Sequence, residues 1–313
     1  MLISVIVPCY NSTSMLNKLV EETLKVFNEL NIFDYEFILV NDCSPSPDTY
    51  VRLEELAEEY SFIKVINLAK NTGQANAQVA ALNFAKGDII INMDDDMQTH
   101  PKNIPILLNK LEEGYDLVLG CYPKKKHSKF RNLLTKMDNG FERVALHKPK
   151  ELSFTSFWVT RKYIRDEIIR YQYPYAFMEG LFLRCAGKIA NVEVEHFERV
   201  EGVSGYNFKK LLKLWSNFTN FTVLPLRIAG IFGAVCSLVG FVYAVYIMIR
   251  KIITPQMLAG YASLVCMILI FFGITLICVG VIGEYVGRIF MCINNAPQFV
   301  IKNTINVVDN EED

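Results

Sequence analysis

The sequence predicts an α/β domain with a mainly parallel sheet, followed by a C-terminal hairpin of two transmembrane helices. Apolar runs of strand length alternate with helical patterns over residues 1–200, and two long stretches near the C-terminus lack charged residues. The mean hydropathy is +0.22 although 21% of the 313 residues are charged. An ordinary charged fraction with a positive mean hydropathy indicates that the apolar residues are concentrated in one part of the chain.

The expected strands are short apolar runs at residues 3–7, 37–40, 63–66, 88–92 and 117–119. Helical patterns separate them at residues 14–30, 48–60, 74–86 and 101–113. Repeated strand–helix–strand units favour a parallel sheet with helices on both faces. Ligands bind beyond the carboxyl ends of the strands in such sheets, so the residues after each strand are the candidate site.

Composition excludes several classes of protein. The chain has 32 Lys and Arg against 33 Asp and Glu, a net charge of −1, so we expect no nucleic-acid partner. Its eight cysteines are scattered, without the close pairs of a zinc site or the density of a disulfide scaffold. They are predicted to be reduced, mostly buried thiols.

The first two strands end in polar residues. The first continues as Val7-Pro8-Cys9-Tyr10-Asn11, and the second as Val40-Asn41-Asp42-Cys43-Ser44-Pro45. Pro8 stiffens the strand exit, Tyr10 could lie against a base, and Asp42 could accept hydrogen bonds from a base or ribose. The alternative is ordinary turn chemistry, since these residue types dominate turns.

The fourth strand is followed by three adjacent acids, Asp94-Asp95-Asp96. Alternation along an extended chain would put Asp94 and Asp96 on one side, within reach of one divalent cation. Three adjacent acids repel one another unless a cation compensates them. A solvated acidic loop is the alternative, but the position directly after a central strand favours a metal site. His100, beside Pro101, is expected to start a helix rather than bind metal.

Two uncharged stretches near the C-terminus are long enough to cross a bilayer. Residues 228–249 are 22 positions without Asp, Glu, Lys or Arg, about 33 Å of helix, and residues 258–282 form a second such run. We therefore place transmembrane helices at 226–251 and 257–283 and a cytoplasmic tail at 284–313. A pair of core helices in a soluble protein is the alternative.

The expected location is the inner (cytoplasmic) membrane, with several crossings and the domain of residues 1–205 in the cytoplasm. The sequence begins MLISVIVPCYN, which is typical of a strand and lacks the basic region of a signal peptide. An even number of crossings returns the tail to the cytoplasm, and most of the flanking basic residues agree with this orientation.

A segment at residues 206–225 is predicted to lie in the membrane interface. Phe208, Leu211, Leu212 and Trp215 share one helical face, while Lys209, Lys210 and Lys213 share the opposite one. The apolar face could enter the acyl boundary and the lysines could attract anionic headgroups. A helix packed on the soluble domain is the alternative.

A resemblance to a known family rests on ordered motifs. SVIVPCYN, VNDCSP, NTGQANA at residues 71–77 and MDDDMQTHP resemble the successive motifs of family 2 glycosyltransferases, which have the GT-A (Rossmann-like) fold. SGYNFKKLLKLW at 204–215, NFTNFTVLPLR and GEYVGR at 283–288 are similar to the membrane-anchored polyprenyl-phosphate glycosyltransferases. Within that group the chain most resembles transferases of 4-deoxy-4-formamido-L-arabinose or glucose to undecaprenyl phosphate.

The resemblance implies roles for individual residues. Asp94 and Asp96 would bind Mg²⁺ or Mn²⁺ and act as catalytic residues together with Arg199. The donor would contact Pro8, Tyr10, Asn11, Asp42, Gln74, Asp94, Asp95 and Gln98. The acceptor would contact Arg199, Ser204, Tyr206, Glu284 and Arg288. The chain departs from the family pattern at three places. Ser12 stands where many members carry an acid, and Gly120-Cys121-Tyr122-Pro123 stands where many carry an arginine soon after the fifth strand. Ser156-Phe157-Trp158 stands where members have an SFR-like stretch, so that Arg161 is the nearest cation.

The predicted function is an inverting transfer of a sugar from a nucleotide sugar, expected to be a UDP-sugar, to polyprenyl (undecaprenyl) phosphate for the cell envelope. A lipid phosphate has a second pKa near about 6, so it is already a nucleophile at neutral pH. Arg199 could clamp its oxygens, or could form a surface salt bridge with Glu198 or Glu201. A homo-oligomer is also expected.

Two other functions would explain part of the sequence. A processive polysaccharide synthase would share the domain, but it usually has more spans and a QxxRW motif, which the sequence lacks. A non-catalytic membrane scaffold would explain the hairpin, but it gives no reason for three polar strand ends.

Overall fold

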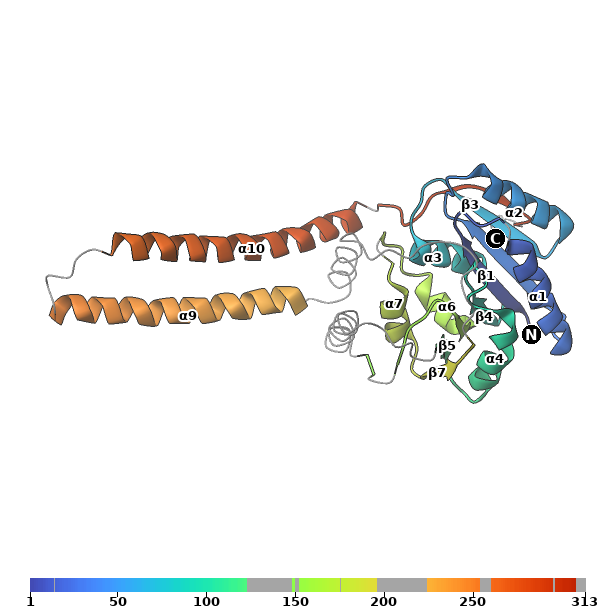
Figure 1. Ribbon diagram of the computed structural model, residues 1–313, viewed down its shortest axis with the longest axis horizontal. Coiled ribbons are helices and arrows are strands. Elements are labelled where there is room, and N and C mark those ends of the chain that lie inside the picture. The colour runs from blue at the N-terminus through green and yellow to red at the C-terminus, as the bar shows by residue number, and fades with distance from the viewer. Residues whose placement is uncertain are drawn as a thin grey trace. The chain divides into compact units, whose positions relative to one another are not determined.

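The computed structural model describes residues 1–13, 15–122, 148–149, 152–174, 176–195, 224–253, 260–294 and 296–307. The chain forms two units, Met1–Asn207 together with Ala296–Asp313, and Phe208–Asn295 (Figure 1). The first unit contains the N-terminal α/β domain and the second contains the apolar helices.

An eight-stranded sheet forms the centre of the first unit, in the order β7-β5-β6-β4-β1-β2-β3-β8. The strands are β1 (Ile3–Cys9), β2 (Tyr35–Asn41), β3 (Ile63–Leu68), β4 (Ile89–Asn92), β5 (Leu117–Cys121), β6 (Trp158–Arg161), β7 (Ile189–Glu193) and β8 (Ile301–Ile305). Strand β6 is antiparallel to β4 and β5, and β8 is antiparallel to β3, while the other pairs are parallel. The prediction of a mainly parallel sheet is confirmed.

Helices cover both faces of this sheet, with α1, α2 and α4 on one face and α3, α6 and α7 on the other (Figure 1). Their bounds are α1 (Leu16–Glu29), α2 (Pro47–Glu59), α3 (Gln74–Phe84), the 3₁₀ turn η1 (Pro101–Asn103), α4 (Ile104–Glu112), α6 (Lys162–Ile168) and α7 (Met178–Cys185). His100 accepts a hydrogen bond from the Lys102 N–H at the start of η1, as expected for a residue that begins a helix.

The hydrophobic core lies on both faces of the sheet, because successive side chains of a buried strand point to opposite faces. Ile3, Val5 and Val7 of β1 lie in the hydrophobic cluster that also contains Leu19 of α1 and Leu53 of α2. Strands buried on both faces are continuous apolar runs, which is why the first five could be located from the sequence. On the other face the buried Trp158 ring packs edge-on against Phe182, with ring centroids 4.9 Å apart.

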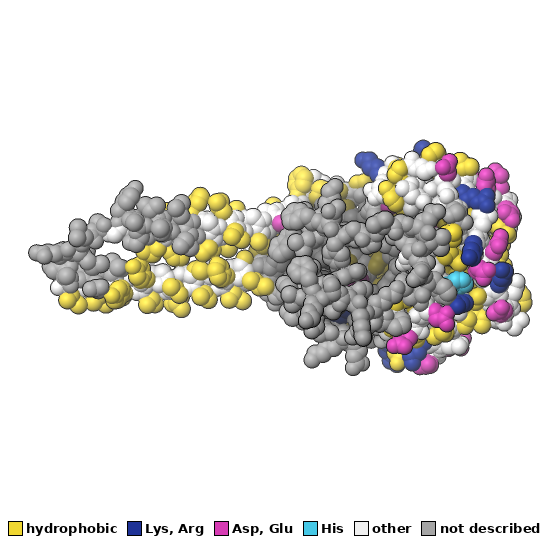
Figure 2. Space-filling model, in the orientation of Figure 1, with side chains coloured by type: hydrophobic (Ala, Val, Ile, Leu, Met, Phe, Trp, Pro, Cys, Tyr) yellow, Lys and Arg dark blue, Asp and Glu magenta, His cyan; other side chains and the backbone are white. Residues whose placement is uncertain are grey.

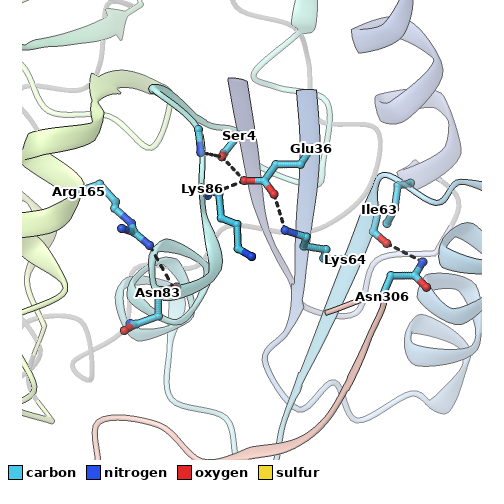
Figure 3. Close-up of polar contacts among 9 residues, drawn as sticks. Ser4, Glu36, Ile63, Lys64, Asn83, Lys86, Arg165 and Asn306 are labelled. Carbon is cyan, nitrogen blue, oxygen red and sulfur yellow. Dashed lines mark hydrogen bonds and ion pairs between the residues drawn. The ribbon is translucent and has the colours of Figure 1, made fainter. Parts of the chain in front are cut away.

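A buried polar network ties the amino ends of the central strands together (Figure 3). The carboxylate of Glu36, only 6% exposed, accepts hydrogen bonds from the Ser4 hydroxyl, the Lys64 ammonium and, at 2.6 Å, the Lys86 N–H. Ser4 Oγ in turn accepts from the Gly87 N–H at 2.8 Å. Burial alone would raise the pKa of Glu36, but these hydrogen bonds outweigh it and hold the pKa below its usual value.

Replacing Glu36→Gln is expected to lower the free energy of unfolding by about 2–3 kcal/mol near neutral pH, because Lys64 loses its charged partner in a buried site. A carboxylate with a depressed folded-state pKa stabilises the fold above its unfolded pKa, near about 4.3, and loses this contribution as the pH falls through the folded pKa. Thermal unfolding from pH 7 to pH 3 should therefore show a difference in the free energy of unfolding between the two proteins. This difference should stay constant down to about pH 4.5 and become smaller below it. A difference that is unchanged down to pH 3 would contradict this role of Glu36.

The second unit contains two long apolar helices, α9 (Leu224–Ile253) and α10 (Tyr261–Ile293). In the described part of the chain, one helix, Phe271–Ile293, has the length and composition to cross a membrane, and Ile228–Tyr243 is a shorter apolar helix. Figure 2 shows hydrophobic side chains over much of the described surface of these helices. Exposed apolar surface of this extent is typical of contact with lipid.

The helices run past the predicted spans, and α9 covers Leu224–Ile253 where a span at 226–251 was expected. The second span was expected to end at residue 283, whereas α10 continues to Ile293. Glu284 and Arg288 form an ion pair one turn apart on this part of α10. Most of the segment predicted to lie in the interface, residues 206–223, falls outside the described residues.

The segment predicted as a tail contains the edge strand β8. Its residues pair with β3 from Val65↔Ile305 to Leu68↔Ile301, and the Ala69 N–H donates to the Val300 carbonyl at 2.8 Å. Asn306 closes the strand by donating to the Ile63 carbonyl at 3.0 Å (Figure 3) and to the Ala57 carbonyl at 2.7 Å. The chain after α10 therefore belongs to the same sheet as the N-terminal strands.

Candidate active site

Polar side chains gather at the carboxyl edge of the sheet. Tyr10–Ser12 follow β1, Asp42 follows β2, Gln74 begins α3 after β3, and Asp94–Asp96 follow β4. The structure brings these four segments together through side-chain hydrogen bonds that cross from one segment to the next. This is the edge where the sequence predicted the site.

Asp94 is held by residues from two other elements. The Gln74 amide donates to Asp94 Oδ1 at 2.8 Å, and the Ser156 hydroxyl donates to Asp94 Oδ2. Burial, together with the neighbouring charges of Asp96 and Asp95, outweighs these hydrogen bonds and raises the pKa of Asp94 to about 6. Burial, together with the charges of Asp94 and Asp96, raises the pKa of Tyr122 to about 12. Tyr122 is therefore a neighbour of both carboxylates.

Asp95 forms hydrogen bonds to the loop after β1. Its Oδ2 accepts a hydrogen bond from the Tyr10 N–H at 3.0 Å and another from the Ser12 hydroxyl. Burial raises the pKa of Asp95 in spite of these bonds. Its carboxylate thus fixes the backbone of the loop that carries Tyr10 and Asn11. A contact between Asp95 and the donor stays a prediction.

The three acids do not lie along an extended chain. Strand β4 ends at Asn92, residues 95–96 form a turn, and Met97 has a φ of +61°, in the left-handed region. The Gln98 N–H donates to Asp96 Oδ1 at 3.1 Å and closes this turn. Asp94 and Asp96 are thus brought near each other by a turn, not by strand alternation. Within the described residues, no group of three His, Cys, Asp or Glu side chains is arranged to hold a metal.

Asp42, 4% exposed, organises the loop before α3. Its Oδ1 accepts from the Thr72 N–H at 2.7 Å and from the Thr72 hydroxyl at 3.1 Å, and its Oδ2 accepts from the Gly73 N–H at 2.9 Å. Gly73 has a φ of +85°, which a residue with a side chain rarely adopts, so this loop requires glycine there. A contact between Asp42 and a base or ribose stays a prediction.

Pro8, Tyr10 and Asn11 take different positions. Pro8 is buried within β1, opposite Val40. Tyr10 is 48% exposed, which leaves its ring free to lie against a flat ligand. The Asn11 N–H donates to Ser44 Oγ at 3.1 Å, and Asn11 Oδ1 accepts from the Ser46 N–H at 3.4 Å, so Asn11 joins the loops after β1 and β2.

A model of a known protein family matches the part of the chain that contains this edge of the sheet. The model of glycosyl transferase family 2 matches residues 4–171, which contain every strand-end segment described above. This chain belongs to glycosyl transferase family 2. A second model, the GtrB C-terminal hairpin, matches residues 224–289 and so covers most of α9 and α10. The predicted family and the GT-A fold with a C-terminal hairpin are confirmed.

Curated relatives match this glycosyltransferase over nearly its whole length. An undecaprenyl-phosphate 4-deoxy-4-formamido-L-arabinose transferase of Proteus mirabilis is 33% identical over 309 residues, 97% of this chain and 94% of that protein. The enzyme of the same name from Photorhabdus laumondii is 31% identical over 317 residues, 99% of this chain and 97% of that protein. A solved structure of Mycobacterium tuberculosis glucosyl-3-phosphoglycerate synthase, in complex with Mn²⁺, UDP and phosphoglyceric acid, aligns at 17% identity with a TM-score of 0.49, over 68% of this chain and 74% of that chain.

The remaining candidate residues of this glycosyltransferase lie elsewhere. Arg199, Ser204 and Tyr206 fall outside the described residues, so their roles stay predictions. Glu284 and Arg288 pair with each other in α10, in the second unit. Arg161 donates to the Tyr115 and Leu111 carbonyls at 3.0 and 2.8 Å. It therefore holds the backbone before β5, which makes it a structural residue of the domain.

Two contacts in the site were not predicted from the sequence. Ser156 bonds Asp94, and Ser12 bonds Asp95. Ser12 departs from the family pattern, and that departure was a signal available in the sequence, whereas Ser156 occupies the serine position of the family's SFR-like stretch. In both cases a serine hydroxyl can donate to a carboxylate.

Proposed function

We propose that this glycosyltransferase moves one sugar from a nucleotide sugar, a UDP-sugar, to a polyprenyl phosphate such as undecaprenyl phosphate. The observation that carries the proposal is the Asp94 and Asp96 pair, held beside the Tyr10–Ser12 loop in a chain that also has an apolar hairpin. The names of the two curated relatives support the acceptor class. A homo-oligomer stays a prediction.

The carboxylates of Asp94 and Asp96 fit a divalent cation. Their oxygens are the hard ligands that Mg²⁺ and Mn²⁺ prefer, and their mutual repulsion in a half-buried site would be relieved by a positive charge. The cation would stabilise the charge that develops on the departing nucleoside diphosphate. Gln74 and Ser156 orient Asp94 for this role, as donors to ligating carboxylates commonly do.

The donor would lie along the loops that the hydrogen bonds hold. Tyr10 offers an exposed ring for the base, and Asn11 is fixed by Ser44 and Ser46. Asp42 orders Thr72 and Gly73 at the start of α3, where free N–H groups of a helix end favour a diphosphate. Gln98 would line the same site from the turn after Asp96.

The acceptor needs positioning more than activation. A lipid phosphate oxygen would form a bond to the anomeric carbon, while the bond from that carbon to the diphosphate breaks and its electron pair leaves with the nucleoside diphosphate. Displacement from the opposite side inverts the anomeric centre. Because the lipid phosphate is largely a dianion at neutral pH, no strong general base is required. Arg199, Ser204 and Tyr206 are proposed to hold it, with Glu284 and Arg288 contacting the lipid.

The inner membrane, with the domain in the cytoplasm, is the proposed location. Strand β8 follows α10 and pairs in the same sheet as β1–β4, so any crossings between the N-terminal strands and β8 must be even in number. This chain path supports two spans, α9 and α10, with both ends of the hairpin on the side of the domain.

A reporter fused after Asp313 is accordingly expected to be cytoplasmic, and one inserted near Thr254 to be external. Accessibility of each reporter in intact cells gives the answer. An external C-terminus would contradict both the hairpin and the cytosolic donor.

The proposed transfer is tested with the purified full chain in liposomes that contain undecaprenyl phosphate, incubated with Mg²⁺ and a panel of nucleotide sugars. Mass spectrometry of the lipids should find one sugar added to the lipid phosphate for one donor of the panel. Sugar polymers on the lipid would favour a processive synthase, and transfer only to water or to soluble acceptors would overturn the proposed acceptor.

A further inference from the structure

An asparagine ladder runs across the edge of the sheet that ends at β8. Asn41 of β2 lies opposite Asn67 of β3, which lies opposite Asn303 of β8. Asn41 Nδ2 donates to Asn67 Oδ1 at 2.9 Å, and Asn67 Nδ2 donates to Asn303 Oδ1 at 2.9 Å. Asn303 Nδ2 then donates to the Tyr50 hydroxyl. Asn41 and Asn67 are buried, so these bonds satisfy amides that have little access to water.

The same ladder continues to the loop that carries the donor-site residues. Asn41 Oδ1 accepts from the Ser44 N–H at 3.1 Å and from the Ser44 hydroxyl at 2.6 Å. Because the Ser44 hydroxyl donates to Asn41, its oxygen is left to accept, and it accepts from the Asn11 N–H at 3.1 Å. A continuous path of hydrogen bonds therefore joins Asn303 to Asn11.

The amides of the path all point in one direction. The NH₂ groups of Asn41 and Asn67 face β8, and that of Asn303 on β8 faces Tyr50. Each carbonyl oxygen accepts from the side of the donor loop. If Asn67 turned its amide over, its NH₂ would face the NH₂ of Asn41, which would leave two buried donors opposed. The acceptor oxygen of Asn303 is what holds Asn67 in the orientation that Asn41 needs. Aligned bonds of this kind also polarise one another.

Asn11, at the end of this path, has a backbone conformation that such support would stabilise. Its φ of +58° lies in the left-handed region, which a residue with a side chain occupies at an energetic cost unless its surroundings hold it there. The bond from its N–H to Ser44 supplies such support. The neighbouring Tyr10 N–H is held separately by Asp95.

We propose that strand β8, through Asn303, is a positioning element of the donor site, which fixes the Asn11 loop from a strand that follows the second apolar helix in the chain. The proposal rests on the proposed function only in taking the Tyr10–Ser12 loop as nucleotide-binding. The link from β8 to the loop follows from the hydrogen bonds alone.

Three variants of the full chain test it. Asn303→Leu removes the acceptor for Asn67 and keeps the backbone pairing of β8. Asn303→Asp keeps an acceptor oxygen toward Asn67 Nδ2 and serves as the conservative rescue. Lys302→Ala is the matched control, because Lys302 is an exposed neighbour on the same strand that lies outside the ladder. Asn303→Asp and Lys302→Ala should keep the melting temperature close to that of the unchanged protein, whereas Asn303→Leu should lower it modestly, because the buried Asn67 NH₂ loses its acceptor.

Hydrogen exchange of residues 10–12 and 44–46 is the first readout. Asn303→Leu should speed exchange there about three- to tenfold, the effect of weakening one hydrogen bond between neutral groups, while Asn303→Asp and Lys302→Ala should leave it unchanged. UDP affinity in Mg²⁺ and the donor KM should weaken by a similar factor in Asn303→Leu, with kcat at saturating donor retained.

Two results would overturn the proposal. One is an unchanged rate of hydrogen exchange at residues 10–12 and 44–46 in Asn303→Leu. The other is an equal increase of this rate in Asn303→Asp, which would mean that strand packing causes the change and not the hydrogen bond between Asn67 and Asn303. If the unchanged protein binds no UDP but Asn303→Leu still speeds hydrogen exchange, the result would support the path from β8 to the Asn11 loop. It would count against UDP as the nucleotide of the proposed donor.

Discussion

Asp96→Asn is expected to reduce sugar transfer at least about a hundredfold while the protein stays folded and membrane-bound. The substitution removes one of the two carboxylates proposed to hold the cation, and it also removes a charge that raises the pKa of Asp94. The apoprotein should therefore lose no stability, because the repulsion between the two acids is relieved. Transfer to undecaprenyl phosphate in liposomes and the melting temperature are the two measurements.

Asp88→Asn is the matched control for this variant. Asp88 lies just before β4, whereas Asp96 lies just after it. The Asp88 Oδ2 accepts a hydrogen bond from the Leu2 N–H at 3.0 Å, and the amide oxygen of an asparagine can accept the same bond. Activity should be retained in this control. Full activity in Asp96→Asn, or in the unchanged enzyme after treatment with EDTA, would contradict the metal assignment.

Asp42→Ala is expected to raise the donor KM at least about tenfold and to lower the free energy of unfolding by about 2–3 kcal/mol. The carboxylate is buried and accepts three hydrogen bonds from Thr72 and Gly73, so its removal leaves two N–H donors without their acceptor and releases the loop before α3. Steady-state kinetics against donor concentration and thermal unfolding measure the two effects.

Asp48→Ala controls for the loss of an acid in the same loop region. Asp48 is exposed in the first turn of α2 and accepts from the Ser46 hydroxyl at 2.9 Å. Its removal should cost no more than about 1 kcal/mol and leave the donor KM unchanged. An Asp42→Ala protein as stable and as active as this control would show that the loop is held in another way.

The sequence predicted the first half of the sheet because its strands are buried on both faces and separated by regular helices. Strands β1–β5 are such continuous apolar runs. Strand β6 has only four residues and runs antiparallel between β4 and β5, which no local period indicates. Strand β8 pairs with a strand far away in the sequence, Asn303 with Asn67, and such non-local pairing leaves no trace in local periodicity.

The candidate site was located from the sequence, but its internal contacts were not. The acids after β4 stand at the predicted edge because a strand end can be located from a buried run. The three acids have different contacts because they lie at a turn, which contains Met97 in a left-handed conformation. In this turn the Asp95 carboxylate accepts a hydrogen bond from the Tyr10 N–H of the β1 loop. The bond from Ser156 to Asp94 requires the β4–β6 pairing, which brings Asn92 opposite Trp158. The residues predicted to contact the acceptor phosphate, Arg199, Ser204 and Tyr206, stay predictions.

The central claim is that a lipid phosphate oxygen displaces a nucleoside diphosphate from the sugar at the Asp94 and Asp96 site. It is tested most directly by quantifying, in one reaction of the full chain with undecaprenyl phosphate and its donor, the nucleotide released and the phosphates in the lipid product. The account predicts one nucleoside diphosphate released for each lipid that gains a sugar and keeps a single phosphate. Release of a nucleoside monophosphate with a lipid that carries two phosphates would contradict it, because the attack would then have taken place at phosphorus.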